Sequence, residues 1–192
     1  MKCSIFIAPS VDGYIATQEG SVSWLESVGK PLSQKEKNSD LNQQFEKCFE
    51  YYIQTVDSMI IGRKLLKVLS SFNLTPEQWP YKNTKIFALS HSLNEVPKNL
   101  QNHIELHNGP IPSLIAKLEI EGYKHAYVDG GMIITSFLNL KLINEITLTQ
   151  APVLLGCGVP LFGTLLQHIK LENAQATVFP NDFIEIKYSV KY

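Results

Sequence analysis

The chain has 192 residues, of which 44% are hydrophobic and 18% charged, and its formal net charge is −1. This length and composition fit a single globular domain over residues 1–192, and the charge provides no basic surface for nucleic acid or an anionic membrane. Because no apolar run approaches the roughly 18 residues of a membrane helix and the first residues lack the layout of a signal peptide, we expect a cytoplasmic protein with no membrane partner.

The cysteines and histidines give no pattern of metal ligands. Cys3, Cys48 and Cys157 are odd in number and widely spaced, which argues against a disulfide framework and against a zinc site. His103 and His107 have the spacing of helical ligands, but they flank a strand-like run. We therefore expect no metal site.

The chain opens with a short apolar strand, Lys2–Ala8, and a loop with the turn signal Asp12-Gly13 follows it. Loops beyond the carboxyl ends of central strands hold ligands in many α/β proteins. Ser10 and Asp12 are therefore candidate site residues. The alternative, that Asp12 only caps the turn, stays open here.

A long polar segment, Gln18–Lys37, contains one aromatic residue, Trp24. Irregular segments of this length are often lids or binding loops, so Trp24 either lines a pocket or pins the loop to the core. The next helix is predicted to begin with Asp40 as its N-cap. It carries Glu46, which is either a solvated surface group or a proton donor beside a ligand cleft.

The second and third strands both end in polar groups. Gly62 closes one strand and is followed by two cations, Arg63 and Lys64, at the start of a new helix. Cations at a helix start oppose the helix dipole unless an anion offsets them, so a phosphate site is as plausible as a solvated helix end. The third strand ends in Ser90-His91, which either binds a phosphate or forms a capped turn.

A glycine pair, Gly130-Gly131, separates an apolar strand from the following helix. Residues without a Cβ let the backbone approach a ligand closely, and the free N–H groups of the helix start favour an anion. We therefore expect a phosphate-bearing ligand at Gly130–Met132, with a tightly packed structural turn as the alternative. The sequence contains neither the dinucleotide motif GxGxxG nor the phosphate loop GxxxxGK[ST] at this position.

Strands and helices alternate through the middle of the chain, which predicts a largely parallel sheet. The tail contains two extended runs, 174–178 and 183–190. Apolar and polar residues alternate in the second run, which is typical of an antiparallel strand with one wet face. The predicted architecture is a parallel core with an antiparallel hairpin at its C-terminal edge.

Five segments, in this order and across nearly the whole chain, resemble the dihydrofolate reductase-like superfamily, and most closely the reductase domain of bacterial riboflavin biosynthesis. The last one carries the string PVLLGxGxPLF, which is typical of the riboflavin-reductase-like branch. The resemblance implies a three-layer α/β/α fold with a mostly parallel central sheet. The segments are SVDGYIA (10–16), DSMIIGRK (57–64), KIFALS (85–90), VDGG (128–131) and LINEITLTQAPVLLGCGVPLF (142–162).

The resemblance also implies a role for individual residues around bound NADPH, with Asp12 and Glu46 as the catalytic candidates. It places the pyrophosphate at Gly130, Gly131, Met132 and Ile133, the adenosine-side phosphates at Gly62, Arg63 and Lys64, the 2′-phosphate near Ser90 and His91, the nicotinamide against Ala8 and Ile15, and the substrate against Ser10, Asp12 and Trp24.

The activity implied is an NADPH-dependent hydride transfer to a C=N or C=O group of a small heterocycle, of the pteridine or ribosylaminopyrimidine type, as in 5-amino-6-(5-phosphoribosylamino)uracil reductase. NADH is a second candidate cofactor, because His91 stands where the family often has a more basic residue. A homodimer is implied as well, with contacts near Leu161–Phe162 and the edge hairpin.

Two other functions stay open. Leu65 and Met132 depart from the family pattern, which favours a catalytically silent reductase fold that serves as a nucleotide-binding or assembly protein. A flavin- or nucleotide-binding module is the third hypothesis.

Overall fold

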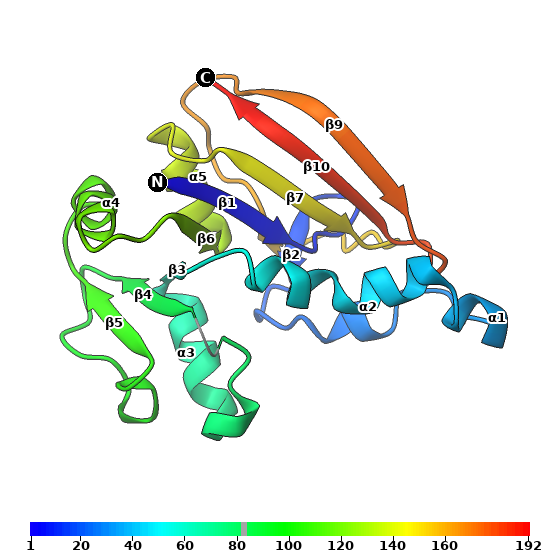
Figure 1. Cartoon of the computed structure of the whole chain (residues 1–192), viewed down its shortest axis with the longest axis horizontal. Coiled ribbons are helices and arrows are strands. Elements are labelled where there is room, and N and C mark those ends of the chain that lie inside the picture. Colours follow the sequence, from blue (N-terminus) through cyan, green and yellow to red (C-terminus); the bar gives the residue numbers. More distant parts are fainter. Residues whose placement is uncertain (82–83) are drawn as a thin grey trace.

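The computed structural model describes residues 1–81 and 84–192 and is built around an eight-stranded sheet with the order β5-β4-β3-β6-β1-β7-β10-β9 (Figure 1). A separate ribbon pairs β2 (Tyr14–Ala16) with β8 (Val159–Pro160). The strands of the large sheet are β1 (Lys2–Ile7), β3 (Ser58–Gly62), β4 (Lys85–Leu89), β5 (Ile104–His107), β6 (His125–Asp129), β7 (Glu145–Gln150), β9 (Lys170–Val178) and β10 (Ile184–Lys191).

The strands from β5 to β7 run parallel, and β10 and β9 complete the sheet as an antiparallel hairpin. This confirms the predicted architecture. In β10, Ile184 and Ile186 alternate with Glu185 and Lys187, so the register against β7 puts the apolar side chains on one face and the charged ones on the other.

Helices cover both faces of the sheet, which confirms the three-layer α/β/α arrangement. Successive residues of β3 show why. Ile60 packs into the core beneath α4 and α5, whereas Met59 and Ile61 pack into the core beneath α2 and α3. All three side chains are 0% exposed, and burial of such a side chain contributes roughly 1.5–3 kcal/mol. The helices are α1 (Gln34–Lys37), α2 (Asp40–Ile53), α3 (Arg63–Phe72), α4 (Ile111–Ile120) and α5 (Gly131–Asn139).

The structure differs from the sequence prediction at the start of α2 and in the segment before it. Ser39, not Asp40, is the N-cap of α2, because its side chain accepts a hydrogen bond from the backbone N–H of Asn42. The segment Gln18–Lys37 is less irregular than expected, since it contains a short 3₁₀ helix, η1 (Ser23–Glu26), and α1. Among the described residues, no helix combines the length and hydropathy that crossing a bilayer requires.

Candidate functional site

The carboxyl ends of the parallel strands place two helix starts side by side. Gly62 ends β3 and caps α3, and Gly130 follows β6 and caps α5. A Cβ on Gly62 would lie 3.0 Å from Cγ1 of Ile133 in the first turn of α5, so the two helix starts are neighbours. Neither helix has a side-chain cap or an acidic residue in its first turn. Two sets of free N–H groups and two positive dipole ends therefore meet at one edge of the sheet, an arrangement that favours an anionic ligand.

Exposed cations add to this positive edge. Arg63 donates a hydrogen bond to Oγ of Ser92, and no described acidic residue forms an ion pair with Arg63 or Lys64. Ser90 is 8% exposed, and its hydroxyl accepts hydrogen bonds from the backbone N–H groups of Ser92 (3.2 Å) and Leu93 (3.1 Å). Ser90 therefore shapes the turn, and the hydroxyl that accepts the hydrogen bond from Arg63 belongs to Ser92, the residue after the two candidates Ser90 and His91.

His91, the other candidate at this turn, is exposed, and Nδ1 of its ring lies 3.1 Å from the carbonyl oxygen of Asn108. Met132 is 77% exposed in the first turn of α5. Both side chains are thus open to solvent at the carboxyl edge of the sheet.

The glycine pair is required by the fold around it. Gly130 has φ = 97°, a conformation that favours glycine. A Cβ on Gly131 would lie 2.4 Å from the carbonyl oxygen of Pro160 and 3.0 Å from that of Leu161. The backbone that includes β8 therefore lies directly against the start of α5. Because Leu161 also donates its N–H to the carbonyl oxygen of Gly13 (2.9 Å), the loop after β1 is held at the same place.

In that loop, Asp12 is fully engaged in hydrogen bonds. Its carboxylate accepts them from the Ser10 hydroxyl (2.6 Å) and from the backbone N–H groups of Leu155 (3.1 Å) and Gly156 (2.7 Å). These bonds, the one from Ser10 foremost, lower the pKa of Asp12 below its usual value. The carboxylate is therefore ionised at neutral pH and is a poor proton donor.

Glu46, the second expected catalytic residue, is exposed on α2. Its Oε1 accepts a hydrogen bond from Nδ2 of Asn42 (2.9 Å), which also donates to the carbonyl oxygen of Lys37 (3.1 Å). Asn42 is 3% exposed and so fixes one oxygen of Glu46.

Asp129 is the acidic residue that sequence reasoning missed. It ends β6, a central strand, and its Oδ1 accepts the N–H of Gly130 (2.7 Å). Burial raises the pKa of Asp129 above its usual value. The signal in the sequence is the acidic residue directly before the glycine pair in VDGG.

The last expected site residues are Trp24, Ala8 and Ile15. Trp24 packs against a cluster of Ala151, Phe179 and Phe183, and its buried Nε1 has no hydrogen-bond partner in the described part of the chain. Trp24 thus pins its loop to the core while retaining a free donor. Ala8 and Ile15 are half-buried at the end of β1 and in β2.

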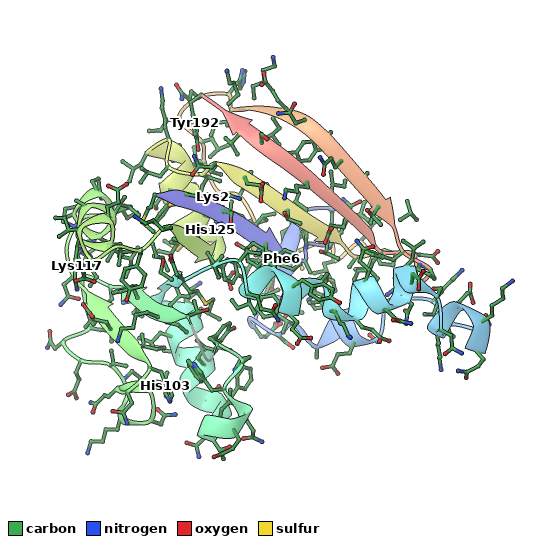
Figure 2. All side chains as sticks on the ribbon, viewed as in Figure 1. Lys2, Phe6, His103, Lys117, His125 and Tyr192 are labelled. Carbon is green, nitrogen blue, oxygen red and sulfur yellow. The ribbon has the colours of Figure 1, made fainter. Side chains whose placement is uncertain are left out.

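At the amino end of the sheet, an aspartate accepts hydrogen bonds from backbone N–H groups. Oδ2 of Asp57 accepts the N–H of Lys124 (2.6 Å), and Oδ1 accepts that of His125 (3.2 Å). A groove of about 350 Å³ lies here between α2 and the strands, with Lys2, Phe6 and His125 in its wall (Figure 2).

Comparison with known proteins supports a reductase. A sequence model of the RibD C-terminal domain matches residues 2–184. A protein of Shewanella sp. PV-4, whose name assigns it to riboflavin biosynthesis, is 35% identical over 100% of both chains, with a TM-score of 0.85.

Two more distant structures share the fold. One is the diaminohydroxyphosphoribosylaminopyrimidine deaminase/5-amino-6-(5-phosphoribosylamino)uracil reductase of Thermotoga maritima, with 12% identity, a TM-score of 0.63 and coverage of 98% of this chain and 56% of that one. The other is dihydrofolate reductase of Enterococcus faecalis complexed with NADP(H), with 8% identity, a TM-score of 0.58 and coverage of 98% and 94%. The dihydrofolate reductase-like fold is thereby confirmed, and the chain belongs to the RibD C-terminal domain family.

Proposed function

We propose that the protein is an NADPH-dependent reductase that transfers a hydride to a C=N or C=O group of a small heterocycle of the pteridine or ribosylaminopyrimidine type. The observation that carries the proposal is the pair of uncapped helix starts, α3 and α5, beside Arg63 at the carboxyl edge of the sheet. The names of the two distant neighbours, a uracil-derivative reductase and a complex with NADP(H), support the substrate class and the cofactor.

The residues present fit the phosphates of such a cofactor. Free backbone N–H groups and unpaired cations are the donors that phosphate oxygens require, and the space that a Cβ on Gly130 would occupy has no neighbouring heavy atom within 4 Å. The bound nicotinamide would supply the hydride, and the protein would supply alignment and exclude water. In this proposal the pyrophosphate is held by Gly130, Gly131, Met132 and Ile133, the adenosine-side phosphates by Gly62, Arg63 and Lys64, the 2′-phosphate by Ser90, His91 and Ser92, and the nicotinamide by Ala8 and Ile15.

The substrate would lie against Ser10 and Trp24, while the carboxylate of Asp12 stays bonded to the N–H groups of Leu155 and Gly156. Of the acidic residues, Asp129 best suits a proton donor, because its raised pKa keeps it protonated at higher pH. The lowered pKa of Asp12 gives that residue the opposite tendency.

A homodimer is part of the proposal. Phe162 is 38% exposed beside the start of α5, and Val178 is 63% exposed on the edge strand β9. Exposed apolar side chains on an unpaired edge strand favour association with a second sheet. Sedimentation of the purified protein would test this point.

The melting temperature with saturating NADPH, with NADH and without nucleotide tests the cofactor. A ligand that binds only the folded state at a hundredfold excess over its dissociation constant stabilises it by about 2.7 kcal/mol. We expect NADPH to raise the melting temperature and Arg63→Ala to remove most of the rise. The matched control is Lys67→Ala, an exposed cation one turn further along α3, which should leave the rise intact.

No rise with either nucleotide would sink the reductase proposal. A rise with NADPH but no oxidation of NADPH across a panel of pteridines and aminopyrimidines would support the catalytically silent alternative instead.

A further inference from the structure

We propose that Asp12 is a positioning residue that fixes the segment Leu155–Leu161 against the start of α5 and thereby sets the affinity for the cofactor. This inference rests on the proposed function, since α5 is the expected phosphate site. It assigns Asp12 a role distinct from proton transfer or substrate contact. It also explains why an aspartate stands in a turn where many residues would suffice.

The first step is the hold that Asp12 has on a distant part of the chain. Its two carboxylate oxygens accept the N–H groups of Leu155 (3.1 Å) and Gly156 (2.7 Å), which lie 143 and 144 residues away in sequence. The hydroxyl of Ser10, which is 1% exposed, orients the carboxylate at 2.6 Å and accepts the N–H of Tyr14 at 3.0 Å. Hydrogen bonds to a charged acceptor are the stronger kind, so this clamp outweighs an ordinary turn contact.

The second step leads from the clamp to α5. Beyond Gly156 the chain pairs with β2, so that Pro160 lies opposite Tyr14. The carbonyl oxygen of Pro160 then lies only 2.4 Å from the position that a Cβ on Gly131 would occupy. The segment is thus clamped at one end by Asp12 and packed at the other against the first residue of α5. If the clamp is released, the wall of the expected phosphate site loses its fixed place.

The third step separates positioning from catalysis. All three donors to Asp12 favour its charged form and lower its pKa. Two of them are backbone N–H groups that would lose their acceptor if the carboxylate turned toward a substrate. A positioning role therefore accounts for the contacts, whereas proton transfer would have to break them.

The test compares two aspartates with the same pattern of contacts. Asp57 accepts two backbone N–H groups, of Lys124 and His125, and the hydroxyl of Ser58, but it lies at the amino end of the sheet. Asp57→Ala is therefore the matched control for Asp12→Ala. Asp12→Asn keeps an oxygen acceptor and serves as the conservative variant.

Three quantities are measured in the full-length protein: amide hydrogen exchange at Leu155 and Gly156, the NADPH dissociation constant, and kcat with its pH profile on any substrate found. For Asp12→Ala we expect exchange and the dissociation constant to rise by about tenfold or more, with kcat at saturating NADPH and its pH profile unchanged. Asp12→Asn should lie between wild type and Asp12→Ala. Asp57→Ala should leave all three quantities near wild type.

Unchanged exchange, or an unchanged dissociation constant, in Asp12→Ala would overturn the inference. So would a fall in kcat with altered pH dependence at constant affinity, which would return Asp12 to catalysis. Wild-type protein that binds no nicotinamide nucleotide would refute the proposed function and the cofactor part of this inference, while the exchange data would still decide whether Asp12 holds the segment.

Discussion

The two ends of the parallel sheet differ in how many of their polar groups have partners within the protein. At the amino end, polar groups satisfy one another. His125 donates from Nδ1 to the carbonyl oxygen of Thr55 (2.8 Å), so its Nε2 must accept from the Ser4 hydroxyl (2.7 Å), and Ser4 in turn accepts from Tyr52 (2.7 Å). Glu145 pairs with Lys2 there.

At the carboxyl end, Asp12 is likewise held by hydrogen bonds, but two helix starts and two cations lack such partners. The starts of α3 and α5 have no side-chain caps, and Arg63 and Lys64 have no ion pair within the described residues. Because buried and aligned polar groups are normally satisfied in a folded protein, a set that stays open is the better candidate for a ligand site. Substitutions at the two ends should therefore affect different properties.

The largest effect is expected for Asp129→Asn, which removes the proposed proton donor but can still accept the N–H of Gly130. A general acid typically contributes about 100-fold or more, so kcat should fall by at least that factor. Asp57→Asn, the control at the amino end, should leave kcat near wild type. Equal losses of kcat in both variants would contradict the idea that only the carboxyl end carries the catalytic site.

The same variant has a defined effect on stability. Because the folded-state pKa of Asp129 is raised, its contribution is most favourable at low pH and is lost as the pH rises through that pKa. Asn carries no charge, so Asp129→Asn should be no less stable than wild type at pH 8 in urea unfolding. A large loss of stability at that pH would show that the carboxylate itself supports the fold.

The second largest effect is expected for Gly131→Ala. The new methyl group would meet the backbone oxygen of Pro160 at 2.4 Å, and overpacking against backbone that cannot move away typically costs about 1–3 kcal/mol. Gly62→Ala is the milder control, since its methyl would meet Cγ1 of the flexible Ile133 side chain at 3.0 Å. Urea unfolding should show the larger loss in Gly131→Ala, and equal losses would contradict the close approach of the Pro160 backbone.

The same contrast explains what the sequence could reveal. Gly62, Gly130 and the adjacent helix starts could be predicted because glycine, cations and apolar periodicity are local signals. The antiparallel hairpin could be predicted from the alternation in β10. The cap of α2 was placed one residue late, because Ser39 and Asp40 are both good N-cap residues and only geometry separates them.

The rest depends on contacts between distant segments. Two partners of Asp12, Leu155 and Gly156, lie 143 and 144 residues away, so no local pattern distinguishes its clamp from a simple turn cap. The raised pKa of Asp129 comes from burial, which depends on the packing around β6. The only signal for Asp129 in the sequence is its place in VDGG, where an acidic side chain ends a central strand.

A third, moderate effect concerns His125 at the amino end. Burial is the main cause that lowers its pKa, and the charge of Lys2 acts in the same direction. The hydrogen bond to the carbonyl of Thr55 and, more weakly, the charges of Glu145 and Asp57 oppose this shift. The folded state therefore binds this proton more weakly than the unfolded chain, and the stability that neutral His125 contributes is lost as the pH falls below about 6.5.

Urea unfolding of wild type and His125→Gln at pH 7.5 and pH 5 measures this effect. Wild type should lose more stability between the two pH values than His125→Gln. His168→Gln, at an exposed position, should behave as wild type does. An identical pH response of stability in wild type and His125→Gln would show that His125 does not contribute to stability through its hydrogen bonds. A change in NADPH affinity in His125→Gln would show that the cofactor site reaches the amino end of the sheet.

The smallest effect is expected for Lys187→Ala, which tests how much the ion pairs at the amino end stabilise the fold. Nζ of Lys187 lies 3.2 Å from one oxygen of Glu145, and Lys2 lies 3.3 Å from the other. The lysine side chains are 46% and 43% exposed, so each pair should contribute only about 0.2–1 kcal/mol. High salt should reduce that difference from wild type. A loss that is both larger and insensitive to salt would mean that Glu145, at 19% exposure, needs both lysines to offset its burial.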